Sequence, residues 1–558
     1  MSSTQQNRQE TGAEPATDFG AVIVGAGFSG LYMLHSLRDY LGLSARVLET
    51  GDGVGGTWYW NRYPGARSDS PSYIYCYSFS EDLRQEWDWT EKYPEQREMR
   101  GYLQHVAEQF DLNRDIRFST QVVDASYDED TKRWTIRTDS GEEMTAQFFI
   151  AAVGALSSAN LPDIAGRDTF AGERYHTGQW PHEGVDFSGK RVGVIGTGAT
   201  AIQAIPLIAR EAEHLTVFQR TANYAIPARN GPVDPEVQQQ RKADYDGIWD
   251  RIRQSYFGFE LWFEDHGALE DPPEERERKY QAHWDEGGFA LWLGNYMDIF
   301  FTREANDTVS EYMRRKIQER VDDPETAEKL TPRDHPFGTK RVPLETNYYE
   351  AFNRDNVTLV DVKSDPIQEI TPTGLRTGDG GEYEFDVLVF ATGFDAMTGP
   401  LNNINIRGRG GRLLRDRGRG GRLLRDKWAE GPATYLGLTS ADFPNMFTIT
   451  GPQSPSVLSN MPVSIEQHVE FVSRIISDMR ERGAEVIEAA QQAEDEWVAH
   501  TQEVAHSTLL PQTATWYMGA NIPGKPRVFM PYLGGVGNYR QHCDQVAAND
   551  YEGFVFSS

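Results

Sequence analysis

Short apolar runs that end in glycine-rich turns recur along the chain and predict buried β-strands. One run, residues 21–24, leads into Gly25-Ala-Gly27-Phe-Ser-Gly30, and another, residues 191–195, leads into Gly196-Thr-Gly198-Ala-Thr-Ala201. A further apolar run follows each turn, at residues 46–48 and 215–218. Strand, turn, helix start and strand in this order are the context in which a glycine turn binds a dinucleotide. Two such units predict an α/β protein with two Rossmann-like domains.

The two units differ in the residue that meets the ribose. Nineteen residues after the third small residue, the first unit has Glu49 and the second has Arg220. A carboxylate accepts hydrogen bonds from a ribose 2′-OH, whereas an arginine suits a 2′-phosphate. We therefore predict FAD in the first unit and NADPH in the second. The candidate contacts within these units are Gly25, Gly27, Gly30 and Glu49 for FAD, and Gly196, Thr197, Gly198, Ala199, Thr200, Gln203, Arg220 and Thr221 for NADP.

Two more apolar runs, ending at Gly154 and Gly393, are expected where the chain leaves the FAD domain and returns to it. Charged, helical sequence fills the region between Asp234 and Leu330, with Val309, Met313, Ile317 and Val321 on one face and Asp307 as a candidate cap. The predicted boundaries are a disordered N-terminus at 1–18, an FAD domain at 19–154 and 391–558, a linker at 155–185, an NADPH domain at 186–230 and 336–390, and a helical insertion at 231–335.

Composition narrows the class of protein. The 558 residues include 55 Lys and Arg against 84 Asp and Glu, a net charge of −29 that argues against nucleic acid or acidic membranes as partners. The two cysteines form no CxxC pair, which disfavours a flavin disulfide reductase, and no histidine spacing suggests a metal site. The polar start, Met1 to Asp18, contains no signal-length apolar core, so we expect a cytoplasmic protein, monomeric or weakly oligomeric.

The segment between the two units carries the most specific motif. Phe170, Gly172, His176, Trp180 and Pro181 form FxGxxxHxxxW followed by proline. A second motif runs from Gly55 to Asp69. With these motifs the chain resembles the Baeyer–Villiger monooxygenases, in particular the cyclohexanone, phenylacetone and steroid monooxygenase group, from about Gly20 to Phe556. The resemblance implies FAD, NADPH and O2, and conversion of a ketone to an ester or lactone through a flavin C4a-peroxide and a tetrahedral (Criegee) adduct.

The resemblance also implies site residues. Arg341 is expected to stabilise the developing anion, because a guanidinium stays protonated at any working pH, and Asp69 is expected to orient it. Lys340, pointing to the opposite side, is expected at the 2′-phosphate. Further implied FAD contacts are Gly56, Thr57, Trp58, Asp69, Tyr75, Val122 and Met461, and further NADP contacts are Arg67, Lys340, Arg341 and Trp516. Ala155, Leu156, Ser456, Val457 and Leu458 are implied at the substrate pocket, and the helix that starts near Pro462 is implied to point at the flavin.

Alternatives remain open at this level. His176 and Trp180 suit packing at a hinge better than direct chemistry. The same flavin chemistry can oxygenate sulfur or nitrogen, and a redox sensor without catalysis is a rival of another class. The ketone is undefined, although the stretch Phe289 to Leu293 is expected to wall its pocket. Finally, residues 407–416 are repeated without a change as 417–426. We interpret the second copy as a tolerated surface-loop insertion rather than an anion site.

Overall fold

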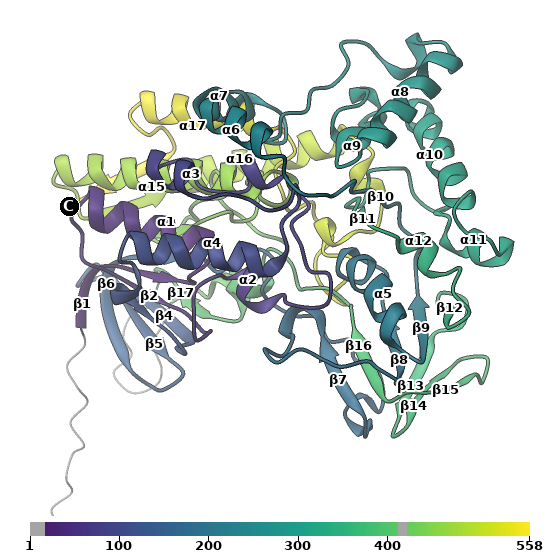
Figure 1. The fold of residues 1–558 in the computed structure, drawn as a ribbon. Coiled ribbons are helices and arrows are strands. Elements are labelled where there is room, and N and C mark those ends of the chain that lie inside the picture. The colour runs from purple at the N-terminus through teal and green to yellow at the C-terminus, as the bar shows by residue number, and fades with distance from the viewer. Residues whose placement is uncertain (1–16, 411–420) are drawn as a thin grey trace, which may run out of the picture.

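The computed structural model describes residues 17–410 and 421–558, which form two large sheets with a cap of helices above them (Figure 1). The predicted disorder of the N-terminus falls mostly on residues 1–16, outside the described residues. Thr17 and Asp18 contradict that prediction, because they belong to strand β1 (Thr17–Val24) and pair with Met144 and Thr145.

The first sheet has eight strands in the order β17-β4-β5-β6-β1-β2-β3, with β18 also paired to β6. The strands beside β1 run parallel to it, and β4, β5 and β6 form an antiparallel extension. The C-terminal part of the chain thus returns to complete a sheet begun by the N-terminal part. Their bounds are β2 Ala45–Leu48, β3 Ile116–Arg117, β4 Val122–Asp128, β5 Arg133–Thr138, β6 Glu143–Ala151, β17 Asn405–Arg407 and β18 Met446–Thr448.

Helices cover this sheet on the side where α1 and α15 pack against each other (Figure 1). α15 begins with Pro462 in its first turn, as the sequence predicts, and Asn460 precedes it without a side-chain cap. The helices of this domain are α1 Phe28–His35, α2 Thr57–Trp60, α3 Glu81–Glu86, α4 Gln96–Gln109, α13 Gly399–Asn402, α14 Leu424–Lys427, α15 Met461–Glu481, α16 Gln491–His506 and α17 Val536–Ala548. A small two-stranded antiparallel sheet of β19 (Val486–Ala489) and β20 (Phe554–Ser557) lies beside them.

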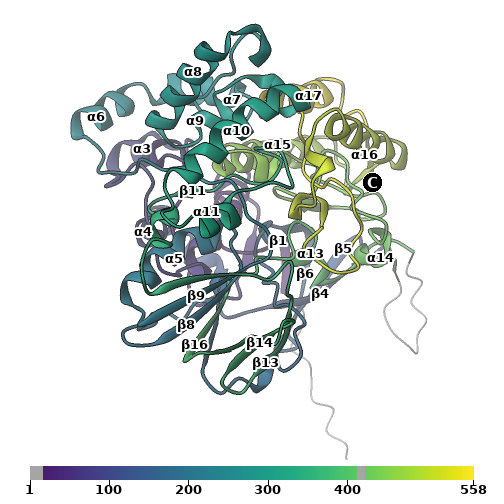
Figure 2. The same ribbon diagram turned by 90° about the vertical axis from the view of Figure 1, so that its right-hand side faces the viewer.

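The second sheet is wholly parallel, in the order β12-β9-β8-β16-β7. Its strands are β7 Glu173–His176, β8 Arg191–Ile195, β9 His214–Gln219, β12 Val357–Asp361 and β16 Val387–Phe390, and α5 (Ala199–Glu211) follows β8. β7 corrects the predicted linker at 155–185, because Glu173–His176, within the motif, forms an edge strand of this sheet. A three-stranded antiparallel sheet, β13 (Ile367–Thr371), β14 (Gly374–Thr377) and β15 (Glu382–Glu384), lies nearby (Figure 2).

The two connections between the domains run side by side. Asn160 N donates to Gly393 O at 2.9 Å, Asp395 N donates to Ser158 O at 2.8 Å, and Ala159 bridges Phe394 in an antiparallel pair. The NADPH domain is therefore inserted in the FAD domain through a paired, two-stranded hinge, in agreement with the predicted fold class.

The helical insertion lies at the top of the molecule, away from the second sheet (Figure 2). Val309, Met313 and Ile317 are buried on one face of α10, and Val321 is buried just beyond its end. The predicted cap at Asp307 is wrong: α10 begins at Arg303 after Thr302, and Asp307 accepts from Arg303 Nε inside the helix. The insertion contains α6 Pro235–Ala243, α7 Tyr245–Gln254, α8 Pro273–Glu286, α9 Ala290–Leu293, α10 Arg303–Gln318 and α11 Pro324–Leu330, followed by α12 Tyr348–Ala351 and the pair β10 Ile226–Pro227 and β11 Leu344–Glu345.

A buried carboxyl joins this insertion to the FAD domain. Glu466 on α15 accepts from Ser78 N at 2.5 Å and from the Ser78 hydroxyl, and Arg253 Nη2 of α7 lies 3.7 Å from its Oε2. The pKa of Glu466 is raised to about 7, mainly by burial and in addition by the charge of Glu470.

The tandem repeat is described only at its outer ends. The predicted insertion, residues 417–426, begins within residues 411–420, which lie outside the described residues. The described ends, 407–410 and 421–426, read Arg-Gly-Arg-Gly and Gly-Arg-Leu-Leu-Arg-Asp, which together spell one copy of the repeat. These ends pair with each other: Gly408 N donates to Arg422 O and Arg422 N donates to Arg409 O, both at 3.1 Å.

Candidate active site

The first glycine turn brings two chain segments into close contact. Gly25 has a φ of +105°, and a Cβ on Gly30 would lie 1.8 Å from the Gly25 carbonyl oxygen. Gly27 and Gly56 face each other so closely that a Cβ on Gly56 would lie 2.8 Å from the Gly27 Cα. The predicted FAD residues of the first and second motifs therefore meet at the start of α1, where free backbone N–H groups suit a pyrophosphate.

Glu49 follows β2 and is 5% exposed. Its carboxylate accepts hydrogen bonds from Ala26 N and Gly51 N, both at 2.7 Å. Burial raises the pKa of Glu49, and these hydrogen bonds only partly offset the rise. The two backbone donors hold the carboxylate beside the glycine turn, the position that a ribose 2′-OH requires.

The second glycine turn, at Gly196, resembles the first in its positive φ and in its close approach to a backbone carbonyl. Gly196 has a φ of +114°, and a Cβ there would lie 2.4 Å from the Ala391 carbonyl oxygen. Gly198 precedes α5 without a side-chain cap, and nothing lies within 4 Å of where its Cβ would be. Thr197 Oγ1 donates to Thr221 O at 3.2 Å, and Thr200 Oγ1 to Thr177 Oγ1 at 3.1 Å. An open helix start beside ordered threonines suits an anionic group.

Arg220 and Lys340 provide an unpaired positive charge near this turn. Neither side chain makes an ion pair or hydrogen bond with any residue of 17–410 or 421–558. The pKa of Lys340 lies below its ordinary value. Burial is the main cause, the charges of Arg220 and Lys363 add to the lowering, and the charge of Asp334 opposes it. Two neighbouring cations that make no ion pair with an acid of the described residues fit a 2′-phosphate.

Arg341 crosses to the FAD domain instead. Its Nη2 donates to Asp69 Oδ2 at 2.5 Å and its Nη1 donates to Val457 O at 3.1 Å. Asn223 Nδ2 donates to the backbone oxygen of Arg341 at 2.9 Å, which fixes the main chain. Burial lowers the pKa of Arg341, but Asp69 and the nearby Tyr517 raise it to a value above the ordinary one. Sequence reasoning placed Arg341 and Asp69 together, and the structure brings them together.

An apolar cavity lies against this guanidinium. It is lined by Phe257, Phe259, Phe289, Trp292, Leu293, Phe300, Arg341, Leu458, Leu510 and Leu533. The Arg341 guanidinium carbon lies 5.1 Å from the centre of the Phe289 ring and 5.7 Å from that of Trp292. Arg341 is the one charged group on the wall, so a developing anion in the cavity would meet a positive charge with little competing water.

The cavity wall includes Leu458 and, from the predicted stretch Phe289 to Leu293, the residues Phe289, Trp292 and Leu293. Val457 reaches the site through its carbonyl. Ser456 is buried and donates to Thr450 O at 3.1 Å. Met397 links Ser456 to Ala155, because its N donates to Ala155 O at 2.8 Å and its sulfur lies 3.9 Å from Ser456 Oγ. Leu156 is partly buried beside Ala155.

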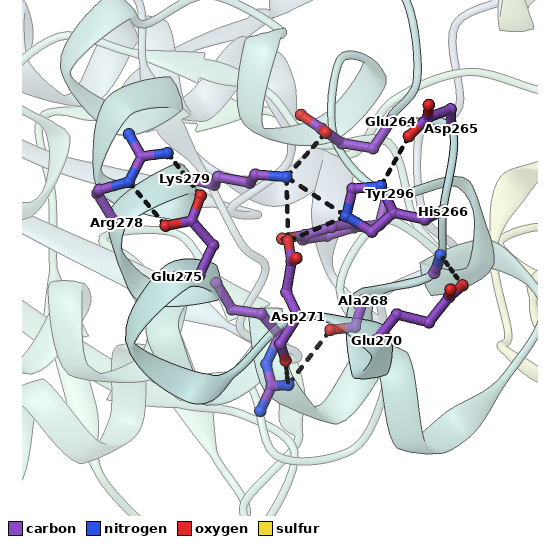
Figure 3. Close-up of polar contacts among 12 residues, drawn as sticks. Glu264, Asp265, His266, Ala268, Glu270, Asp271, Glu275, Arg278, Lys279 and Tyr296 are labelled. Atoms are coloured by element: carbon purple, nitrogen blue, oxygen red, sulfur yellow. Dashed lines mark hydrogen bonds and ion pairs between the residues drawn. The ribbon is translucent and has the colours of Figure 1, made fainter.

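A polar cluster on the insertion anchors the aromatic wall (Figure 3). Asp271 lies at its centre, 3.0 Å from Lys279 Nζ and 3.1 Å from His266 Nε2, and it accepts from the Tyr296 hydroxyl at 2.5 Å. Lys279 also reaches Glu264 at 2.8 Å. The hydrogen bonds of Asp265 and Asp271 raise the pKa of His266. This cluster ties the loop before α8 to Tyr296, which lies just after α9. α9 itself carries Trp292 and Leu293.

The other predicted FAD residues lie on several elements. Trp58 and Tyr75 pack edge to face with ring centres 5.9 Å apart, and the Trp58 Nε1 has no partner among the described residues. Thr57 is exposed at the start of α2, Val122 is buried at the start of β4, and Met461 is partly buried at the first position of α15.

Two predicted NADP residues serve another contact in this structure. Arg67 pairs with Glu91 at 2.8 Å and Glu95 at 3.0 Å. Gln203 on α5 accepts from the Tyr63 hydroxyl at 2.8 Å and donates to Arg67 O at 3.2 Å. Gln203 thus joins α5 to Tyr63 and to the main chain of Arg67 in the second motif.

Comparison with curated proteins shows three close relatives. A Baeyer-Villiger monooxygenase of Pseudooceanicola batsensis is 45% identical over 100% of this chain and 98% of its own length. The acetone monooxygenase (methyl acetate-forming) of a Gordonia species is 44% identical, over 97% and 99% respectively. The phenazine N-monooxygenase of Lysobacter antibioticus is 43% identical, over 97% and 98%.

This chain belongs to the Baeyer–Villiger monooxygenase family. Among solved structures, an oxidized steroid monooxygenase bound to NADP has a TM-score of 0.91 at 48% identity, over 97% of this chain and 100% of that one. A complex of OTEMO with FAD and NADP has a TM-score of 0.92 at 40% identity, with the same coverage. The family and the two-domain fold predicted from the sequence are confirmed.

A family model described as pyridine nucleotide-disulphide oxidoreductase matches residues 22–242, which contain both glycine turns. Cys76 and Cys543 are both buried and free, so this Baeyer–Villiger family member lacks a paired dithiol. The match therefore reflects the shared dinucleotide architecture. No helix in the described ranges could cross a membrane, and no described group of three His, Cys, Asp or Glu could hold a metal.

The fingerprint of the Baeyer–Villiger chain packs at the hinge. His176 is buried, its Nδ1 accepts from Gly178 N at 3.0 Å, and burial lowers its pKa. Trp180 packs against Tyr175, with ring centres 5.4 Å apart, and Pro181 follows it. Phe170 is buried, and a Cβ on Gly172 would lie 2.5 Å from the Asp386 carbonyl oxygen. This geometry supports a packing role for the fingerprint.

The segment around Trp516, a predicted NADP contact, lies on the hinge. Asn521 Nδ2 donates to Phe394 O at 2.7 Å and Lys525 pairs with Asp395 at 2.5 Å. Sequence reasoning missed the next residue, Tyr517, whose ring centre lies 4.3 Å from that of Trp516. It also missed Phe257, Phe259 and Phe300, because aromatic residues in a helical insertion carry no local signal that distinguishes a pocket wall from a core.

Proposed function

We propose that this chain is an FAD-containing, NADPH- and O2-dependent Baeyer–Villiger monooxygenase that converts apolar ketones to esters or lactones. One observation carries the proposal: a guanidinium held by a carboxylate forms the only charged part of an otherwise apolar cavity wall. Such a group stabilises the negative charge that develops on the oxygen of an attacked ketone, without needing a proton transfer.

The residues fit FAD at the first turn. Glu49 is held at the ribose position, and the Gly27–Gly56 approach leaves no room for a Cβ where the backbone would meet a pyrophosphate. Trp58 Nε1 and the uncapped start of α15 offer unused donors nearby. When bound and reduced, FAD supplies with O2 the oxygen atom that is inserted. The related structure with FAD and NADP supports this cofactor pair.

The residues fit NADPH at the second turn, where Arg220 and Lys340 lack acidic partners in the described part of the chain. Arg341 and Asp69 lie between the two predicted cofactor sites. In this assignment Asp69 orients the guanidinium, Val457 O fixes its other end, and the aromatic wall excludes water from the reacting atoms.

Oxygenation of a heteroatom is the second candidate, because the relative from Lysobacter antibioticus is named as an N-monooxygenase. The two activities make different demands on Arg341. Attack on a ketone generates an anion beside the guanidinium, whereas oxygen transfer to sulfur or nitrogen does not. A non-catalytic redox sensor would have no need for the Arg341–Asp69 pair.

The test supplies purified holoenzyme with NADPH, air and a panel of linear, cyclic and aryl ketones, with an aryl sulfide and a tertiary amine for comparison. Esters, lactones, sulfoxides and N-oxides are measured against hydrogen peroxide and NADPH consumed. Ester or lactone at nearly one per NADPH supports the proposal. Sulfoxide or N-oxide without ester supports the heteroatom alternative, and NADPH oxidation to hydrogen peroxide alone with every compound contradicts both.

The finer predictions from composition remain proposals. We propose a cytoplasmic enzyme that works as a monomer or weak oligomer, with no nucleic-acid or membrane partner; its net charge of −29 supports this view by keeping copies apart. Light scattering of the purified protein at several concentrations tests the oligomeric state.

A further inference from the structure

Three short segments of the helical insertion form most of the wall of the apolar cavity. They are residues 257–259, residues 289–293 at α9, and the turn Met297–Phe300, and they supply six of the ten lining residues. α9 and the turn have four residues each, and 257–259 lies in neither helix nor strand. Segments this short have few backbone hydrogen bonds of their own, so contacts with their surroundings fix their positions.

Asp271, at the centre of the polar cluster, meets donors from three parts of the insertion (Figure 3). Its Oδ2 accepts from the Tyr296 hydroxyl at 2.5 Å and lies 3.0 Å from Lys279 Nζ and 3.1 Å from His266 Nε2. Tyr296 follows α9, Lys279 lies on α8, and His266 lies in the loop that follows residues 257–259. A charged acceptor bound by several donors forms a strong and directional anchor.

Tyr296 connects this anchor to α9. Its N accepts no role in α9 itself but donates to Asn295 Oδ1 at 2.8 Å, and Asn295 Nδ2 donates to Leu291 O at 3.1 Å. Asn295 is fully buried, so its amide links the end of α9 to Tyr296 without competition from water. The bond from Tyr296 to Asp271 therefore helps to hold α9, and with it the cavity-lining side chains of Trp292 and Leu293.

The loop that carries Phe257 and Phe259 is held by the same cluster. Its residue Glu264 accepts from Lys279 Nζ at 2.8 Å, and Glu264 N donates to Asn295 O at 3.1 Å. Side chain and backbone of one residue thus fasten this loop to α8 and to the end of α9.

The turn that ends at Phe300 is joined to this loop as well. Ala268, two residues after His266, donates its N to Asp298 Oδ2 at 3.0 Å and to Oδ1 at 3.1 Å. Asp298 belongs to the turn, so the loop between His266 and Asp271 is bonded to the third wall segment. All three segments therefore meet at the polar cluster or at the loop that it holds.

The cavity that these segments enclose is small. It holds about 20 Å³, room for about one water-sized molecule. Even the smallest ketone is larger, so part of the wall moves outward when a ketone is bound there. Because protein interiors are close-packed, a wall that is held firmly resists this movement more as the ketone becomes larger.

We propose that Asp271 is a positioning residue that limits the size of the ketone, because it holds the three wall segments together through Tyr296, Lys279 and His266. The proposal rests on the proposed function for the class of substrate. Asp271 does not line the cavity, so it acts through the wall and not by contact with the ketone.

Three variants of the holoenzyme test this role. Tyr296→Phe removes one hydroxyl and keeps every charge, whereas Asp271→Asn removes the charge and keeps the shape. Glu277→Gln is the matched control, because Glu277 on α8 pairs with Arg315 on α10 at 2.6 Å. That ion pair lies in the same insertion but joins two long helices instead of the wall segments. If Asp271→Asn folds poorly, Tyr296→Phe alone decides the outcome.

The first measurement is amide hydrogen exchange of the holoenzyme without substrate. Tyr296→Phe and Asp271→Asn should speed exchange in residues 257–268 and 289–300 about tenfold, the scale of one hydrogen bond to a charged group. Exchange in α5, in the NADPH domain, should stay constant, and Glu277→Gln should change neither region. Unchanged exchange in the wall segments would overturn the proposal, and so would equally faster exchange in α5.

The second measurement compares kcat/KM for 4-phenyl-2-butanone with that for 2-butanone, two ketones that differ by one phenyl ring. Tyr296→Phe and Asp271→Asn should raise the ratio of the larger to the smaller ketone about tenfold, with an unchanged rate of flavin reduction by NADPH. Glu277→Gln should leave the ratio unchanged. A merely structural role would change both ketones equally, and that result would overturn the proposal.

Failure of the proposed function has a different signature. If the wild type and all variants form hydrogen peroxide but no ester or lactone from any ketone, the proposed function is contradicted, and the size limit falls with it. The exchange rates need no turnover, so they still decide whether Asp271 positions the wall.

Discussion

Lys340 and Arg341 are adjacent in the chain, yet their charges serve two different sites. Lys340 lies near Arg220 and Asp334, on the side of the second glycine turn, whereas Arg341 donates to Asp69 in the FAD domain at 2.5 Å. One short segment, 337–341, thus carries a cation for each predicted cofactor. Asn306 holds this segment from α10, because its side chain bonds both Phe337 N at 3.0 Å and Phe337 O at 2.8 Å.

Replacing Arg341 by alanine should separate the two half-reactions. We expect flavin reduction by NADPH near the wild-type rate, and ester or lactone formation lower by about 10²-fold to 10³-fold, as for loss of a charged donor to a developing anion. Stopped-flow absorbance and product analysis measure the two rates. Arg303→Ala is the control, because Arg303 is 54% exposed and pairs only with Asp307. Lactone at the wild-type rate from Arg341→Ala would refute the role.

Replacing Arg220 by alanine should weaken NADPH more than NADH. The guanidinium has no acidic partner in residues 17–410 or 421–558, so its loss removes only the contact with the 2′-phosphate. We expect the KM for NADPH to rise about 10-fold to 100-fold, in line with one charged hydrogen bond, and the KM for NADH to stay constant. Lys363→Ala is the control, since Lys363 is a nearby cation already paired with Asp334. Equal changes for both nucleotides would contradict the assignment.

The first glycine turn should not accept a side chain. A Cβ on Gly30 would overlap the Gly25 carbonyl oxygen, which forms part of the turn itself. Gly30→Ala should therefore be isolated without FAD or not fold, which the flavin absorbance per protein measures. Gly231→Ala is the control, because nothing lies within 4 Å of its Cβ position. Full flavin content in Gly30→Ala would show that the turn does not hold the cofactor.

Glu466 predicts a pH dependence of stability. Its pKa in the folded protein is about 7, above the ordinary value for a glutamate, so the folded state binds the proton more tightly than the unfolded state. The resulting stabilisation is fully present below the ordinary pKa and is lost as the pH rises through about 7. Urea unfolding should show this decline in the wild type, and Glu466→Gln should remove it. An identical pH profile for both proteins would contradict the prediction.

The repeat offers a test of loop tolerance. Deleting residues 411–420 gives the same polypeptide as deleting 417–426, because the two copies are identical. The deletion would join Gly410 to Gly421, whose φ values are +91° and +132°, between Arg409 and Arg422, which already share a hydrogen bond of 3.1 Å. A Gly-Gly pair at the centre of a two-residue hairpin favours such a closure.

The deletion should therefore leave the melting temperature and turnover close to those of the wild type. Leu424→Ala is the comparison, because Leu424 is 1% exposed in the core of the FAD domain and should lower stability by about 2–5 kcal/mol. A loss of activity on deletion, with stability retained, would show that the second copy has a function.

Sequence reasoning succeeded where the signal is local. Each glycine turn is followed within about thirty residues by its predicted ribose contact, Glu49 or Arg220, so backbone chemistry alone relates each unit to a dinucleotide. The pairing of Arg341 with Asp69 joins residues 272 positions apart, so only the family resemblance could predict it. Tyr517 and the aromatic wall depend on packing between distant segments, which a string of residues does not encode in any period. Asp307 failed as a cap because the helix begins earlier, at Arg303.

The paired connections between the domains have a consequence for how such an enzyme could arise. The inserted domain leaves at Asn160 and returns at Gly393, and these two residues are hydrogen-bonded to each other at 2.9 Å. A unit whose entrance and exit coincide can be spliced into a host, or exchanged for another, without stretching the host chain. The NADPH domain is thus a unit that can be exchanged as a whole, and its junction lies beside the segment that carries Trp516 and Tyr517.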